Sequence, residues 1–432
     1  MRLTRIAIVL SLGAAVSACG AQPQATTAGS ASTSRAAQAL NLTSDQVIVR
    51  DQERIRTNAS DWMAVDELAA AYLQKVREVG DPSYYPKVEE LLSSAIHHDP
   101  DDSEATTLMG TLTLARHQFA EALRWGQKAH ALAPYASRPL GVISDAQTQL
   151  GRYPEAIDSL QLMVNLRPDL SSYSRVSYLR ELYGDVPGAI DAMKMAISAG
   201  GPVPENAAYT EVLLGNLYFN AGKLSDAEAQ YQRSLRDFPG YVQGIAGIAS
   251  VRAAQKNYGE AARLYQRAIE IYPIPQYVIA LGDVFGASNN SKRAGETYDL
   301  AAAEQALFQA NGVDLDQELA LFSADHRRNL PAALAAARRA MRDRPNVVTA
   351  DSLAWTLHEI GNDSEALDAS RAARRLGTLD ALFFFHSGMI EAKLGMKGQA
   401  RADLSKALQI NPYFSVIHGQ EARKTLASLG QT

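Results

Sequence analysis

The sequence holds one cysteine, Cys19, in 432 residues, so no disulfide can form within the chain. Aromatic residues are scarce at 7%, although hydrophobic residues make up 47% of the whole. There is no excess of positive charge, because 42 Lys and Arg face 47 Asp and Glu. Phosphate contacts need clustered cations, so this balance argues against a nucleic-acid partner. A core with few rings and many alanines favours closely packed helices.

Long hydrophobic runs are also missing. Beyond residue 19, no segment approaches the roughly 18 consecutive apolar residues of a membrane-spanning helix. The one apolar run near the start, residues 6–16, is too short to span a bilayer. It follows Arg2 and Arg5 and ends at Ser17 and Ala18. A basic start, a short apolar stretch and small residues are the order of parts in a secretory signal peptide.

Residues 16–19 resemble a bacterial lipobox, whose cysteine receives a diacylglycerol before cleavage leaves it as the mature N-terminus. The resemblance implies that residues 1–18 are removed and that Cys19 carries acyl chains, palmitate among them. The protein would then lie outside the cytoplasm on a membrane surface. Gly20, rather than an aspartate, resembles a signal for outer-membrane sorting; with a single membrane, the anchor would hold the outer face. The alternative is an ordinary signal peptide with an incidental cysteine.

A fixed period runs through the rest of the chain. Ala122 and Ala156 lie 34 residues apart, as do Tyr231 and Tyr265. A period near 34 indicates stacked helix–turn–helix units, each burying its apolar face against the next.

The clearest unit shows what each residue contributes. Gly215 lets two helices approach closely, and Tyr218 is expected to fill the gap beside it. Gly222 can adopt the left-handed conformation that ends a helix. Ser225 is a suitable N-cap for the second helix. Ala227 is small because the helices are expected to cross there.

These residues resemble the tetratricopeptide repeat, and the resemblance covers residues 61–414. The equivalent small residue recurs at Ala122, Ala156, Ala189, Ala227, Ala261, Ala294, Ala333, Ala366 and Ala400, with Val88 in a divergent first unit. The resemblance implies an all-α, right-handed superhelical solenoid of about ten repeats. Residues 415–429 are expected to form a polar-faced helix that caps the last unit.

The period is interrupted once. Between Pro273 and Ala333 the spacing stretches, and residues 297–310 predict an overlong helix. We therefore expect a bend or a division near residue 312, between an N-terminal array (61–311) and a C-terminal array (312–432). Residues 1–18 form the signal peptide in this interpretation. Residues 19–60 form a flexible tether, poor in apolar side chains, with one short amphipathic helix at its end.

No catalytic constellation is recognisable. His358 and Glu359 begin a zinc-protease pattern, but Asn362 stands where the second histidine is needed. Asp325 and His326 could form an orienting pair, yet no nucleophile accompanies them in a recognisable spacing. The sequence predicts no catalytic residue, no metal site and no cofactor, and hence a protein that is not an enzyme.

The resemblance implies that the first helix of each unit lines a concave groove. In the central units this face carries small polar and tyrosine side chains: Tyr178, Tyr209, Asn216, Asn220 and Gln243. Further on it carries Phe322, Trp355, Phe385 and Met389, with Glu318, Asp325 and Asp351 nearby. The first group could hydrogen-bond an extended peptide backbone or sugar hydroxyls. The second could receive an apolar peptide bearing Lys or Arg, or stack against sugar rings. The alternatives are a solvated face and ordinary packing in the core.

Three functions compete at this point. The first is a membrane-anchored, non-enzymatic scaffold that binds an extracytoplasmic protein or peptide. The second is a periplasmic scaffold in exopolysaccharide synthesis or export, with a glycan or its synthase as partner. The third, a cryptic enzyme, has the least support.

Overall fold

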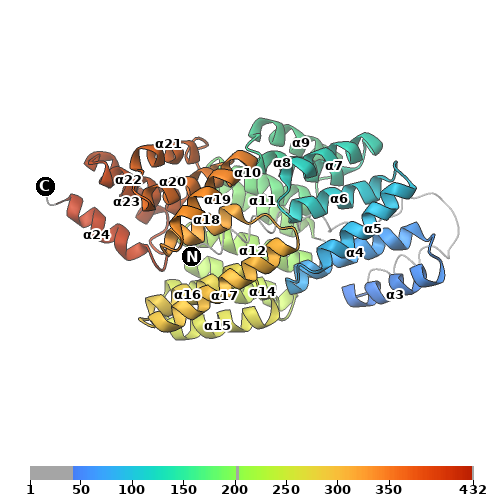
Figure 1. The fold of residues 1–432 in the computed structure, drawn as a ribbon, viewed down its shortest axis with the longest axis horizontal. Coiled ribbons are helices and arrows are strands. Elements are labelled where there is room, and N and C mark those ends of the chain that lie inside the picture. Colours follow the sequence, from blue (N-terminus) through green and yellow to red (C-terminus); the bar gives the residue numbers. More distant parts are fainter. Residues whose placement is uncertain (1–41, 201–203, 431–432) are drawn as a thin grey trace.

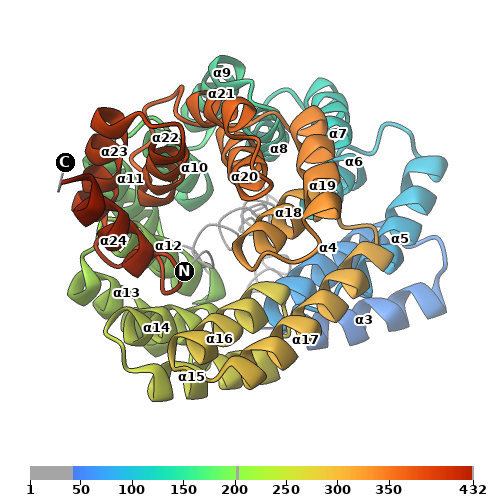
Figure 2. The ribbon, with the colours of Figure 1, turned by 60° about the vertical axis from the view of Figure 1, so that its left-hand side comes forward.

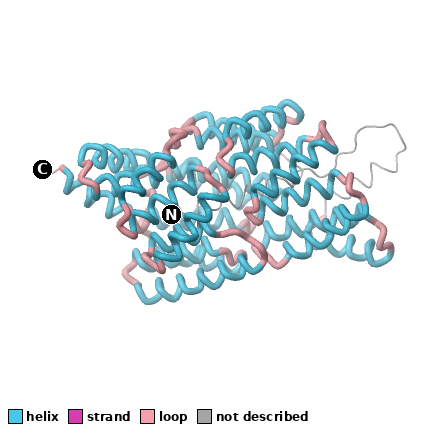
Figure 3. The backbone as a smooth tube through the Cα atoms, turned by 45° about the horizontal axis from the view of Figure 1, so that its top comes forward, coloured by secondary structure: helices cyan, strands magenta, loops and turns pink. Residues whose placement is uncertain are grey.

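The computed structural model describes residues 42–200 and 204–430. These residues form 22 helices and no strand, joined by short loops (Figure 3). The predicted all-α class is therefore confirmed. The lipobox and most of the expected tether, residues 1–41, lie outside the described residues.

Twenty of the helices form ten helix–turn–helix pairs, as the period predicted (Figure 1). The first helices are α4 (Trp62–Val79), α6 (Ser103–Ala115), α8 (Ser137–Gln149), α10 (Leu170–Leu182), α12 (Pro204–Asn220), α14 (Val242–Ala254), α16 (Pro275–Ala287), α18 (Asp316–Asp325), α20 (Val347–Glu359) and α22 (Ala381–Lys393). The second helices are α5 (Tyr84–His98), α7 (Phe119–Leu132), α9 (Tyr153–Leu166), α11 (Val186–Ala199), α13 (Leu224–Asp237), α15 (Tyr258–Ile271), α17 (Ser291–Ala310), α19 (Leu330–Asp343), α21 (Asp363–Ala373) and α23 (Lys397–Ile410).

One further helix lies at each end of the array. Helix α3 (Ser44–Thr57) packs on α4, and its capping box at Thr43 and Gln46 fixes its start. Helix α24 (Gly419–Leu429) buries Ala422 and Leu429 against the last pair, with polar residues on its other face. The short lead-in helix and the capping helix were both predicted.

The periodic small residues lie where the helices of a pair cross. All nine alanines and Val88 are buried, none more than 5% exposed. A larger side chain at a crossing would push the two helices apart, because protein interiors are close-packed.

Two local expectations in the clearest unit were wrong. The ring of Tyr231, not that of Tyr218, lies against Gly215, where an added Cβ would be 2.5 Å from Tyr231 Cε1. Helix α13 begins at Leu224 with Lys223 as its N-cap, so Ser225 lies inside the helix. Gly222 does adopt the expected left-handed conformation, with φ of 73°.

The pairs wind round a common axis (Figure 2). Beyond neighbours in the chain, the close contacts between repeats join first helices, such as α6 with α8 and α18 with α20. Curvature brings elements on the inside of a superhelix closest together, so the first helices line its inner side.

Successive turns of this superhelix lie directly on one another. In each of the first five pairs, the turn between the two helices contacts the loop that follows the pair five places further on. The contacts pair Gly80 with Tyr272, His117 with Asp314, Gly151 with Pro345, Gly184 with Gly377 and Gly222 with Pro412. We call these five contacts the inter-turn seam. In Figure 2, α20 and α22 accordingly lie beside α8 and α10.

Side chains of the second turn donate hydrogen bonds to carbonyls at helix ends of the first. Asn346 Nδ2 donates to the carbonyl oxygen of Gln149 at 3.0 Å, and Asn411 Nδ2 to that of Phe219 at 2.9 Å. Such carbonyls have no partner within their own helix. The bonded residues are 197 and 192 positions apart, so the superhelix completes a turn in fewer than six repeats.

The packing is interrupted once, at the predicted discontinuity. Each described helix packs closely on the next along the chain, except that α17 and α18 hardly meet. Helix α17 has 20 residues, whereas most second helices have 14, which confirms the predicted overlong helix. Its end and the following loop instead bury Phe308, Val313 and Leu315 against the first turn. The division of the chain into two arrays at residue 312 stays a prediction.

Candidate functional site

Aromatic and histidine rings of the last repeats meet in one cluster on the inner helices. The Trp355 ring stacks on His386 with centroids 4.4 Å apart and planes 16° apart, and lies 5.1 Å from His358. Phe385 stacks on His418 at 5.1 Å. We call these five residues the histidine cluster. Trp355 and Phe385 are fully buried in it.

Each histidine of the cluster lies beside a carboxylate. His386 Nδ1 is 3.0 Å from both oxygens of Asp351, His358 Nδ1 is 2.5 Å from Asp363 Oδ1, and His418 Nε2 is 3.2 Å from Asp325 Oδ1. Asp325 also accepts a hydrogen bond from Trp355 Nε1 at 2.8 Å. The structure therefore brings together four of the predicted groove residues: Trp355, Phe385, Asp325 and Asp351. Their contacts are with groups of this same chain.

Glu318 lies elsewhere, in the inter-turn seam. Its Oε2 accepts a hydrogen bond from Arg344 Nη2 at 2.9 Å, and its Oε1 is 3.9 Å from His117 Nδ1. All three side chains are buried, and burial lowers the pKa of His117. Glu318 is thus paired with Arg344 within the fold, and it does not join the histidine cluster.

The other two predicted apolar residues, Phe322 and Met389, lie outside the cluster. Phe322 is 4.9 Å from the ring of His326 and 5.8 Å from that of Tyr298. Met389 is partly buried and packs on the core that contains Trp355.

The central predicted residues do not converge. Asn216 is buried and accepts a hydrogen bond from the Tyr231 hydroxyl at 2.8 Å. Tyr209 is buried near the Arg77 guanidinium, 5.9 Å from its ring centroid. Tyr178, Asn220 and Gln243 are only half-buried. These three, on α10, α12 and α14, keep part of their surface exposed.

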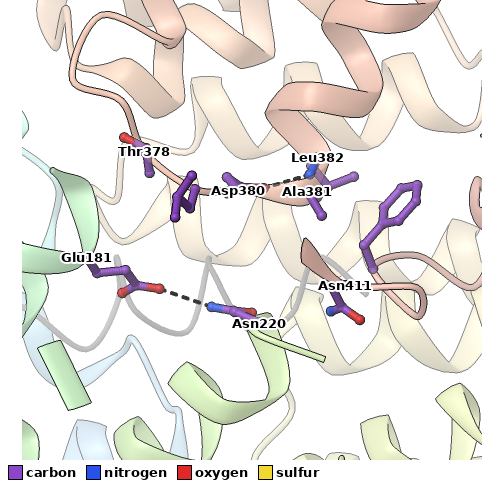
Figure 4. Close-up of a pocket in the computed structure, with 9 residues that line it drawn as sticks. Glu181, Asn220, Thr378, Asp380, Ala381, Leu382 and Asn411 are labelled. Atoms are coloured by element: carbon purple, nitrogen blue, oxygen red, sulfur yellow. Dashed lines mark hydrogen bonds between the residues drawn. The ribbon is translucent and has the colours of Figure 1, made fainter. Parts of the chain in front are cut away.

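Asn220 also lines a small cavity beside the seam (Figure 4). Its amide donates to Glu181 Oε1 at 3.2 Å, and Thr378, Asp380 and Asn411 form the opposite wall. The cavity volume is about 30 Å³. A single water needs roughly 10–15 Å³ of such volume, so the space suits one or two waters and no larger ligand.

The histidines are the functional signal that the sequence interpretation missed. It treated His358 as part of a failed metal motif and His326 as part of a failed catalytic pair. Positions 326, 358, 386 and 418 recur at nearly the repeat spacing. That recurrence could have indicated that their rings gather along one face of successive inner helices.

Within residues 42–200 and 204–430, no group of three or more His, Cys, Asp or Glu side chains is placed to hold a metal ion. No helix in the same residues combines the length and apolar character needed to cross a bilayer.

Comparison with known proteins agrees with this architecture. Residues 212–273, which cover α13, α14, α15 and most of α12, match the tetratricopeptide repeat family. The described residues thus form an all-α repeat superhelix, in which residues 212–273 match the tetratricopeptide repeat.

Individual similarities are low. A segment of 126 residues is 27% identical to anaphase-promoting complex subunit 7 of Arabidopsis thaliana; it is 29% of this chain, and the match spans only 22% of the relative's length. The APC/C hetero-tetramer Cut9–Hcn1 has 14% identity and a TM-score of 0.34, over 89% of this chain and 93% of that one. A thermophilic tetratricopeptide protein of Thermus thermophilus has 23% identity and a TM-score of 0.34, over 36% and 84%.

Proposed function

We propose that the protein is a non-enzymatic scaffold that binds an extracytoplasmic protein or peptide, held at a membrane through a lipid on Cys19. The observation that carries the scaffold role is the array itself: in the described residues, ten helix pairs with a further helix at each end form one superhelix. A repeat array of this kind offers a long surface and binds through it.

The partner is expected on the central inner helices rather than at the histidine cluster. Trp355 and Phe385 have ring faces covered by His386 and His418, so truncating them would disturb the core rather than test binding. Tyr178 and Asn220 lie on inner helices α10 and α12 and are partly exposed. Tyrosine and asparagine are side chains that combine contact area with hydrogen bonding at interfaces.

Site-specific photo-crosslinking in intact cells tests this location. A photoreactive amino acid is placed at Tyr178 or at Asn220, and at Tyr135 as a control. Tyr135 lies in a loop and is 89% exposed, so it reports chance encounters. We expect one and the same protein to be crosslinked from both inner positions and not from the control position.

Two results would contradict the scaffold proposal. One is that neither inner position crosslinks any protein. The other is that the same set of proteins is recovered from Tyr135 as from Tyr178 and Asn220, since a specific surface must discriminate.

Membrane attachment rests on the lipobox resemblance and is tested separately. The mature protein should begin at Cys19, with a mass increased by acyl chains, and should sediment with membranes. Cys19→Ser should remove the mass increase and release the protein into the soluble fraction, because acyl chains supply the binding energy. An unmodified Cys19 in a membrane-bound protein would refute the anchor.

The exopolysaccharide role stays a prediction without a structural observation in its favour. Sugar stacking needs an exposed aromatic face, and the aromatic residues of the predicted groove, Phe322, Trp355 and Phe385, are all buried. Glycan binding by the purified chain would revive this alternative.

A further inference from the structure

His326 is the C-cap of α18 and contacts α16 and α17, across the interruption in packing between α17 and α18. Its Nε2 is 2.8 Å from Asp283 Oδ1 on α16. Its Nδ1 is 2.8 Å from the carbonyl oxygen of Phe322, on its own helix. Tyr298 of α17 donates its hydroxyl to the same Asp283 oxygen at 2.9 Å, and its ring lies 4.2 Å from that of His326.

Both ring nitrogens of His326 therefore face oxygen atoms that only accept hydrogen bonds. A neutral imidazole carries one N–H and one lone pair, so one of these contacts would set two lone pairs against each other. The imidazolium form carries two N–H groups and satisfies both. The side chains of His326 and Asp283 are 8% and 4% exposed, so water cannot readily replace either contact.

We propose that His326 is a proton-dependent clasp that joins α18 and the helices after it to the preceding repeats, across the interruption in helix packing. Elsewhere in the described chain, consecutive helices hold together by extensive packing. Here α16 and α17 meet the end of α18 through the hydrogen bonds of Asp283 with Tyr298 and His326, the contact of the Phe322 and Tyr298 rings, and the ion pair of Arg328 with Asp299. The inter-turn seam holds the same helices to the first turn from the other side.

The clasp should loosen as pH rises. Histidine is the side chain whose ordinary titration falls between pH 5 and 8. Loss of its proton removes the charge on His326 and turns one of its two hydrogen bonds into a repulsion. Burial raises the pKa of Asp283, but the hydrogen bonds from His326 and Tyr298 and the charge of His326 lower it, and together they hold the pKa at about 2 while His326 is charged.

The other charged groups near the clasp are paired. Arg328 pairs with Asp299 of α17, and Arg327 pairs with Glu359 of α20 at 2.7 Å. The neighbouring Asp325 lies 3.2 Å from His418, at the start of α24. His418 is thus the second histidine that can contribute, and the experiment must separate the two.

Amide hydrogen exchange of the full chain, corrected for the intrinsic effect of pH on exchange, tests the clasp. We expect protection of α18 to fall about tenfold between pH 5.5 and 8, because a charge-assisted hydrogen bond is roughly twice as strong as a neutral one. Protection of α8, far from the clasp in sequence, should change much less. In His326→Gln, an amide N–H can still reach Asp283 but cannot titrate, so the fall should disappear.

Three further variants make the result decisive. Asp283→Asn should also abolish the pH response, which guards against a folding defect peculiar to one substitution. His97→Gln, at an exposed end of α5, should leave the response unchanged. The proposal is overturned if the wild type shows no such fall, if His326→Gln retains it, or if only His418→Gln removes it. Partner binding is not measured in any arm, so the result is independent of the proposed scaffold role.

Discussion

At the scale of single residues, the same change from glycine to alanine should have opposite effects at two helical positions. An alanine at Gly215 would place its Cβ against the Tyr231 ring, which also lies against Gly247 of the next repeat. Around Gly295, inside α17, nothing lies within 4 Å of an added Cβ. Gly215→Ala should lower the free energy of unfolding by about 1–3 kcal/mol through overpacking. Gly295→Ala should raise it by about 0.5–1 kcal/mol, because alanine loses less entropy in a helix.

Thermal unfolding of the two variants beside the wild type measures the difference. A fall in midpoint for Gly295→Ala, or no change for Gly215→Ala, would contradict the packing described here.

Asp66 provides a prediction on pH dependence. Burial, together with the nearby charges of Asp102 and Glu104, raises its pKa to about 8. A carboxyl whose pKa is higher in the folded state than its unfolded value of about 3.9 stabilises the fold below that value. This contribution is lost as pH rises towards 8. Asp66→Asn removes the ionisation, so it should unfold at a higher temperature than the wild type at pH 9.

The advantage of Asp66→Asn should shrink steadily as the pH is lowered from 9 to 5. A constant difference between the two proteins over that range would show that ionisation of Asp66 is not responsible.

The sequence predicted the role of a residue correctly where the physical reason for that residue lies within a single repeat. The nine alanines are small because the two helices of their own unit cross there, and that reason repeats at each period. Tyr218 was misassigned because the void beside Gly215 is filled from the second helix, by Tyr231. The pairing of Asp325 with His418 joins residues 93 positions apart, which no spacing rule within a unit reveals.

At the scale of elements, the capping helix α24 should stabilise only the repeats at its own end of the array. Leu429 is 8% exposed and packs in the core that contains Trp355 and Leu404. Leu429→Asn should undock α24 and reduce hydrogen-exchange protection in α22, α23 and α24. Repeat contacts are mostly local, so α4 to α9 should be little affected. Ser428→Asn, at an exposed position of the same helix, is the matched control.

Equal loss of protection along the whole chain would contradict this locality. So would an effect of Ser428→Asn as large as that of Leu429→Asn.

The sequence predicted correctly which segments form helices. It predicted less well how consecutive helices pack on one another. The stretched spacing after Pro273 predicted the overlong helix α17, since extra residues must extend an element or a loop. It did not predict that α17 and α18 would hardly touch, or that His326 would reach back to α16. Those features depend on where the long helix ends in space, which a single-repeat pattern does not specify.

At the scale of the whole molecule, the repeat period predicts a superhelix but not its closure. Whether successive turns touch depends on the small rotation and rise added by each pair. The seam contacts join residues nearly 200 positions apart, such as Asn346 and Gln149. The sequence records this only indirectly, because a turn glycine is needed both for its left-handed conformation and for the close approach of the next turn.

The closure can be tested with two glycines that differ only in what lies next to them. Gly151 and Gly361 both occupy the turn within a helix pair, with φ of 71° and 84°. An added Cβ at Gly151 would lie 2.5 Å from the carbonyl oxygen of Pro345, in the turn of the superhelix above it. Around Gly361 nothing lies within 4 Å, because no further turn follows.

Alanine at either position should destabilise the fold by about 1–2 kcal/mol through left-handed backbone strain. Gly151→Ala should lose more than Gly361→Ala, since its methyl group must also push the second turn away from the first. Hydrogen exchange should then show loosening on both sides of the seam, at α8 to α9 and at α19 to α20. In Gly361→Ala the change should stay within α20 and α21. Equal destabilisation by the two substitutions, with local changes only, would mean that the stacked turns contribute little to holding the superhelix together.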